Sequence, residues 1–116
     1  MVEYTAKFSK KGLMAYISHL DLMLVIRRAM RRADLPFVLT EGFTPRVKIS
    51  IPEALKLGVE SEEEKISFWL KDRMNESEIE KILNNDLPKG IRFNSIEEGR
   101  IINNDKKTTK KRKTEQ

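Results

Sequence analysis

The segments VKISI (residues 47–51) and KISFWLK (residues 65–71) alternate apolar and polar side chains, which is the pattern of β-strands with one buried face. No helical pattern separates them, so they follow each other as two successive strands. The same alternation predicts one strand before them, at residues 4–8, and one strand after them, at residues 91–96. Residues 37–39 are a candidate for a short extra strand.

Two helices are predicted between the outer and the inner strands. Ser18, with Asp21 three residues later, is a capping pattern that begins a helix over residues 18–33. Asn75 begins a second helix over residues 75–87. The order strand, helix, strand, strand, helix, strand predicts a ferredoxin-like α+β fold. We expect a four-stranded antiparallel sheet with both helices on one face and the other face open.

Length and composition limit the class of protein. The chain has 116 residues, a net charge of +5 and no cysteine. We expect a single domain at residues 1–104 and a disordered basic tail at residues 105–116. The absence of cysteine excludes disulfides, thiolate zinc sites and iron–sulfur clusters, and we expect no metal and no cofactor. No apolar run or leader peptide is evident, so a cytoplasmic location without membrane contact is expected.

The alternation along each strand predicts which side chains face away from the core. The residues expected to face the helices are Tyr4, Ala6, Phe8, Val47, Ile49, Ile51, Ile66, Phe68, Leu70, Ile91 and Phe93. Their neighbours, expected on the open face, are Thr5, Lys7, Arg46, Lys48, Ser50, Lys65, Ser67, Trp69, Lys71, Arg92 and Asn94. This outward set is basic, contains no acidic residue and includes the single tryptophan. Sheets of the RRM type hold single-stranded RNA with such a face. The alternative is a tryptophan packed under the loop at residues 52–61, with lysines that are merely solvated.

A second group of candidate contacts lies on the first helix and the loop that follows it. Four arginines form a basic arc, and their like-charged pairs at a spacing of four residues cost a few tenths of a kcal/mol each. We expect His19, beside unpaired helix N–H groups that favour anions, to lie near the loop around Gly42. The alternatives are a structural histidine bonded to a backbone carbonyl, and a Glu41–Arg46 pair. The candidate ligand-binding or RNA-binding residues are His19, Arg27, Arg31, Glu41, Phe43, Arg46, Lys48 and Trp69, and no catalytic residue is assigned.

Four motifs follow one another in a characteristic order: ISHLD (17–21), RAMRRADLP (28–36), EGFTPRVKIS (41–50) and LGVES (57–61). Together they resemble the radical-SAM-linked domain of unknown function, a bacterial family found beside or fused to B12-binding-type radical SAM proteins. The resemblance covers about residues 4–70, although members often carry a second proline where this chain has Val47. It implies a radical SAM protein as partner and, from nearby ribonuclease and ribosomal protein genes, a link to RNA. The chain is not itself a radical SAM enzyme, because the cluster motif requires three cysteines.

The sequence leaves two classes of function open. The first is a non-catalytic, RNA-associated binding module, an accessory to a radical SAM or RNA-processing partner. The second is a protein-interaction subunit that docks a radical SAM enzyme through residues 42–50 without touching RNA. An enzyme that uses His19 and Glu41 is a lesser alternative.

Overall fold

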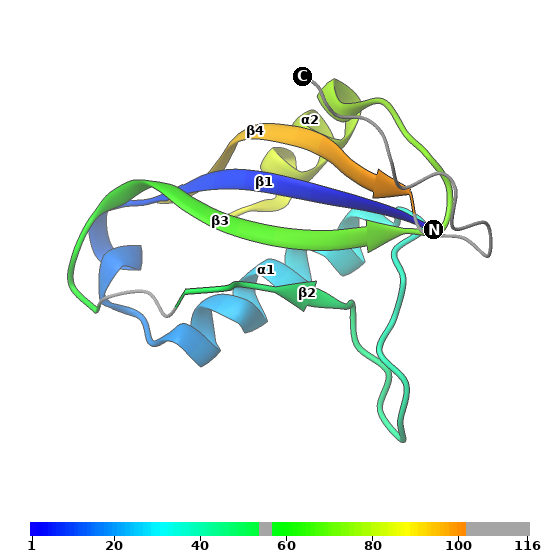
Figure 1. Ribbon diagram of the computed structural model, residues 1–116. Helices are drawn as coiled ribbons and strands as arrows, with labels where there is room; N and C mark the ends of the chain where they lie inside the picture. Colours follow the sequence, from blue (N-terminus) through cyan, green and yellow to red (C-terminus); the bar gives the residue numbers. More distant parts are fainter. Residues whose placement is uncertain (54–56, 102–116) are drawn as a thin grey trace.

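A computed structural model describes residues 1–53 and 57–101, so the expected tail at residues 105–116 lies outside the described residues (Figure 1). Its elements are β1 (Val2–Lys10), the 3₁₀ helix η1 (Gly12–Tyr16), α1 (His19–Ala33), β2 (Ile49–Ser50), β3 (Ser61–Leu70), α2 (Glu76–Asp86) and β4 (Ile91–Ile101). The predicted order of strands and helices is confirmed. The short helix η1 was not predicted, because five residues carry too little periodicity to be recognised.

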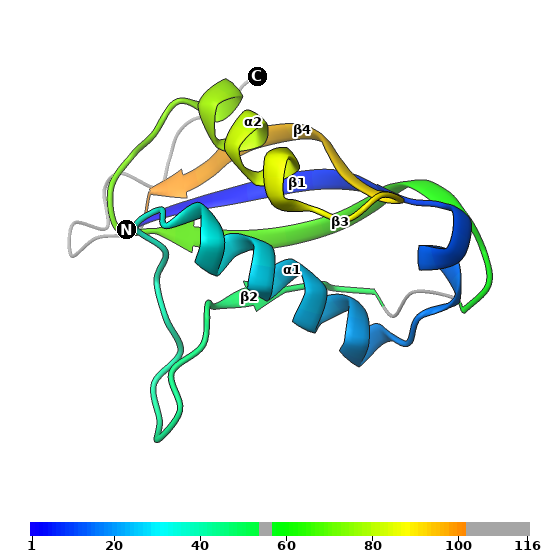
Figure 2. The same ribbon diagram turned by 180° about the vertical axis from the view of Figure 1, so that it is seen from behind.

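The four strands form one antiparallel sheet in the order β2-β3-β1-β4. Both helices lie on the same face of this sheet (Figures 1 and 2). The arrangement is consistent with the predicted ferredoxin-like fold, in which the first and third strands occupy the centre. Among the described residues, no helix is long and apolar enough to cross a membrane.

The core lies between the sheet and the helices, as strand parity predicts. Tyr4, Phe8, Phe68 and Phe93 are buried, and the rings of Tyr4 and Phe68 stack with centroids 5.6 Å apart. The Tyr4 hydroxyl donates to the backbone oxygen of Met74 and accepts from the backbone nitrogen of the same residue, both at 2.9 Å. A single phenol therefore fixes the segment that leads from β3 into α2.

The capping predictions are also confirmed. The Ser18 hydroxyl accepts from the backbone nitrogen of Asp21 at 3.1 Å, at the start of α1. The Asn75 side chain accepts from the backbone nitrogens of Ser77 and Glu78 at 2.9 and 3.2 Å, at the start of α2. Both helices therefore begin where their sequence signals place them.

Strand lengths differ from the prediction on the β2 side of the sheet. Only Ile49 and Ser50 pair regularly with β3, whereas Val47 forms a bridge with Leu39 and Phe37 forms one with Leu70. Residues 37–39 thus form isolated bridges and not the short extra strand that the sequence suggested. They form one arm of a hairpin, residues 37–48, that projects beyond the sheet (Figures 1 and 2). We refer to this segment as the hairpin.

Candidate nucleic-acid interface

The hairpin is held by backbone pairing along its two arms. The backbone nitrogen of Thr40 donates to the oxygen of Arg46 at 2.7 Å, and that of Lys48 donates to the oxygen of Val38 at 2.9 Å. Beyond these pairs every residue from 41 to 46 is exposed. Phe43 lies at the tip with a relative exposure of 107%, so its ring contributes nothing to the core. An ordered hairpin therefore presents a bare aromatic ring to solvent.

Two arginines lie close together at the base of the hairpin. Arg27 extends from α1 and donates its Nε to the backbone oxygen of Val47 at 3.0 Å. Burial lowers the pKa of Arg27, and the positive charge of Arg46 lowers it further. Within residues 1–53 and 57–101, no carboxylate forms an ion pair with either arginine. The structure thus holds two like charges near each other without a counter-ion, while Arg31, one turn further along α1, is exposed.

Trp69 lies on the open face of the sheet beside the same hairpin. The Nζ of Lys48 is 4.8 Å from the centroid of its ring, within the range of a cation–π interaction. Trp69 and Ser61 are at opposite ends of β3, so the end of the loop at 52–61 that enters β3 is far from the indole. Residues 54–56 of that loop lie outside the described residues, so the alternative of a tryptophan packed under the loop stays open. We refer to the following four residues as the hairpin site: Arg27, Arg46, Lys48 and Trp69.

The rest of the open face is less uniformly basic than expected. Lys7 and Lys65 are paired across β1 and β3, which places two positive charges side by side. However, Glu3 lies opposite Trp69, and Glu97 lies on the open face of β4. The expectation of a face without acidic residues is wrong, because β1 begins earlier and β4 ends later than predicted. The open face therefore carries both signs of charge, and Glu3 is the acidic neighbour of Trp69.

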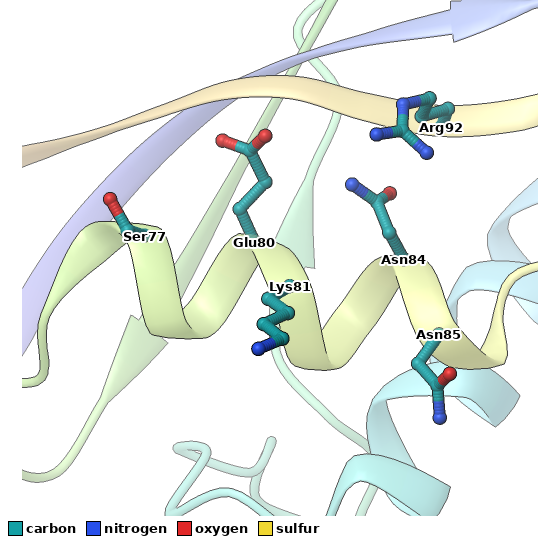
Figure 3. Close-up of a pocket in the computed structure, with 6 residues that line it drawn as sticks. All are labelled: Ser77, Glu80, Lys81, Asn84, Asn85 and Arg92. Carbon is teal, nitrogen blue, oxygen red and sulfur yellow. The ribbon is translucent and has the colours of Figure 1, made fainter.

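Arg92 is exposed between the buried Ile91 and Phe93, as strand parity predicts. On this edge strand it also lines a shallow hollow of about 400 Å³ beside α2 (Figure 3). The amide of Asn84 in this hollow already bonds to the backbone nitrogen and oxygen of Phe93, at 2.8 and 2.9 Å. The other lining residues carry both signs of charge. They are Ser77, Glu80, Lys81 and Asn85. The amide of Asn84 therefore satisfies the backbone of β4 at Phe93, and the mixed lining gives no preference for a ligand of one charge.

His19 does not join the hairpin site. It is the first residue of α1, and the hairpin projects past the other end of that helix (Figure 2). The expected proximity of His19 to the loop around Gly42 is therefore wrong. The Nδ1 of His19 is buried without a hydrogen-bond partner in the described part of the chain, so it does not bond to a backbone carbonyl as the structural alternative required.

Glu41 stays apart from the other candidates as well. It lies at the hairpin tip, and among the described residues no ion pair joins it to Arg46. A helix of 15 residues separates it from His19, about 22 Å at the usual rise per residue. The described residues also contain no group of three acidic or histidine side chains that could bind a metal ion. The geometry thus gives no support to an enzyme built on His19 and Glu41.

Comparison with known proteins places the chain in a family. No curated protein and no solved structure matches it. A family model described as "Uncharacterized protein conserved in bacteria (DUF2344)" matches residues 3–115. Since this match spans almost the whole chain, the protein belongs to that uncharacterised bacterial family.

Proposed function

We propose that the protein is a non-catalytic module that binds single-stranded RNA through the hairpin site. The observation that supports this proposal is that Arg27, Arg46 and Lys48 lie along one arm of the hairpin, with Lys48 over the ring of Trp69 and no carboxylate paired to the three in the described residues. Phosphate groups would supply the missing negative charge, and the indole would offer a surface on which a base stacks.

The repulsion at the base of the hairpin gives the proposal an energetic basis. Burial, and to a smaller extent the positive charge of Arg46, lowers the pKa of Arg27, so the charged form of Arg27 is disfavoured in the free protein. A phosphate bound between them removes this penalty in addition to forming its own ion pairs. A bound RNA is therefore expected to raise the pKa of Arg27.

The single tryptophan makes a direct test possible. A 12-nucleotide oligouridylate is titrated into the full chain while the emission of Trp69 is followed at several salt concentrations. Stacking of a base on the indole is expected to quench the emission. The logarithm of the affinity should fall linearly with the logarithm of the salt concentration, with a slope of about −0.7 for each neutralised phosphate. Unchanged emission at saturating oligonucleotide would contradict the proposal.

Substitutions then locate the contact. Arg46→Ala and Lys48→Ala should each weaken binding and make the slope shallower by about 0.7. Trp69→Ala, followed by the anisotropy of a labelled oligonucleotide, should cost roughly 1–3 kcal/mol of binding free energy. Lys81→Ala is the matched control, because Lys81 is an exposed lysine on α2 and lies on the helical side of the sheet (Figure 3). An equal loss in Lys81→Ala would indicate non-specific charge attraction instead.

A second candidate function is favoured by the exposed ring of Phe43. We propose, as the alternative, that the hairpin contacts a radical SAM protein, as the resemblance of the sequence motifs implies. The test is co-purification of the full chain with the radical SAM protein of the same genome. Phe43→Ser should abolish that complex while leaving oligouridylate binding within twofold if only the protein contact uses the tip. Retention of the complex in Phe43→Ser would exclude the tip as its contact.

A further inference from the structure

Large apolar side chains are exposed at the end of the molecule opposite to the hairpin. Their relative exposures are 87%, 67%, 76%, 48%, 64% and 49% for Leu13, Tyr16, Leu20, Leu24, Leu57 and Val59. We refer to these six residues as the apolar end. Isolated exposed leucines are ordinary, but a group of this size at one place is typical of an interaction surface.

The three segments that carry these residues meet in space. The backbone nitrogen of Gly58 donates to the oxygen of Ala15 at 2.6 Å, which joins the loop before β3 to η1. A Cβ at Gly58 would lie 3.3 Å from the ring of Tyr16, so the loop packs directly against that ring. Figures 1 and 2 show η1, the start of α1 and this loop together at one end of the sheet. The loop and η1 are thus joined directly, and the start of α1 lies at the same end of the molecule.

The core does not account for these side chains. Leu20 and Leu24 are one turn apart on α1, whereas the residues of α1 that are buried against the sheet are Leu22, Ile26, Ala29 and Met30. The helix therefore has a second apolar stripe, on its solvent side, near its beginning. The exposed part of this stripe leaves apolar surface available for burial by another molecule.

The charge around the apolar end is negative. Between Gly12 and Ile26 the only acidic or basic residue apart from His19 is Asp21. On the neighbouring segment Glu60 and Glu63 are exposed, whereas Glu62 is neutralised by Lys11 at 2.9 Å. A partner that buries the leucines would meet these carboxylates at the rim.

We infer that the apolar end docks a protein partner through an amphipathic helix whose apolar face is flanked by lysine or arginine. The apolar side chains supply the area to be buried, and the carboxylates select the charge of the flanks. Residues 105–116 of this chain do not meet the description, since they are basic but contain no apolar side chain. The inference is independent of RNA binding at the hairpin site.

The test uses two synthetic 14-residue peptides with leucine at the same positions of one helix face. One peptide carries lysine and the other glutamate at the remaining positions. The full chain should bind the lysine peptide more tightly than the glutamate peptide. Leu20→Ser and Leu24→Ser should each weaken its binding about tenfold. Leu39→Ser is the matched control, because Leu39 is 47% exposed, like Leu24 at 48%, but lies on the hairpin.

Several results would overturn the inference. Equal binding of the two peptides, or an unchanged Kd in both serine variants, would show that the apolar end is not the contact. A dimer of the parent in sedimentation that Leu24→Ser converts to a monomer would assign the surface to a second copy of the chain. Binding to phosphatidylglycerol vesicles that the same variant loses would assign it to a membrane. Circular dichroism confirms folding, and an unchanged oligouridylate affinity separates this surface from the hairpin site.

Discussion

Replacing Gly90 by alanine tests the close contact between the residue before β4 and the residue after β1. Gly90 precedes β4 with a φ of +104°, a conformation that residues with a side chain rarely adopt. Its carbonyl accepts from the backbone nitrogen of Lys11 at 2.8 Å, which links the end of β1 to the start of β4. An added Cβ would lie 2.6 Å from the backbone oxygen of Lys11 and 3.0 Å from Cγ of Met14. The backbone has to move, because the closest atom is not a flexible side chain.

The expected magnitude follows from three contributions. Strain at the positive φ costs about 1–3 kcal/mol. Movement away from Lys11 weakens their hydrogen bond, which is worth about 1 kcal/mol. The smaller conformational entropy of alanine in the unfolded chain returns about 0.4–1 kcal/mol. Gly90→Ala should therefore destabilise the protein by about 1–3.5 kcal/mol and lower Tm by roughly 5–25 °C.

Thermal unfolding followed by circular dichroism measures this change, with Gly12→Ala as the matched control. Gly12 also has a positive φ, +62°, but an added Cβ there meets no atom within 4 Å. Its substitution should cost about 1 kcal/mol, from backbone strain alone. If the two variants melt within 3 °C of each other, the contact with Lys11 does not constrain the fold as argued. Oligouridylate binding at low temperature should be equal in both, because neither glycine belongs to the hairpin site.

Other predictions concern the core, one ion pair and the C-terminal residues. Tyr4→Phe should lower the free energy of unfolding by about 1–3 kcal/mol in a denaturant titration, because two backbone groups of Met74 lose their partner. Lys11 holds the pKa of Glu62 below its usual value, so the stability that this carboxylate contributes is present above its unfolded pKa and is lost as the pH falls through the folded one. The difference in Tm between the parent and Glu62→Gln should therefore shrink below a pH of about 4.5 and, because the pair is exposed, be small throughout. Deletion of residues 105–116, which contain six lysines and arginines and no apolar side chain, should leave Tm nearly unchanged while weakening oligouridylate binding and making its salt slope shallower.

Much of the fold was predictable because it depends on local periodicity. The alternation around Ile66 and Phe68 identifies both the strand and its buried face, and the structure buries both side chains completely. Ser18 and Asn75 identify the helix starts, since their side chains bond to the first free backbone nitrogens. Strand ends were predicted less well. Because Glu3 and Glu97 lie outside the predicted strands, the open face was expected to be more basic than it is.

The residues that form the hairpin site could not be predicted from periodicity alone. His19 was expected near the hairpin, although the order of the chain already argued against it. The hairpin follows Ala33, the last residue of α1, so it has to begin at the end of the helix that is farthest from His19. The proximity of the charges of Arg27 and Arg46 could not be predicted from the sequence, because it depends on how α1 lies against the edge of the sheet. The apolar end was missed for a related reason: η1 and the loop containing Gly58 are brought together only by tertiary packing.

The two proposed surfaces are far enough apart to act separately. They lie at opposite ends of α1, a helix of 15 residues and so about 22 Å long. Charge is screened over about 8 Å at physiological ionic strength, so the basic hairpin and the acidic rim hardly influence each other. Under the two proposals, each end would select its own ligand at short range. Arg46 and Lys48 would attract phosphate and repel a lysine-flanked helix, whereas Glu60 and Glu63 would do the opposite. An accessory module that holds RNA at one end and a protein at the other needs this separation, because a ligand bound at either end leaves the other end free.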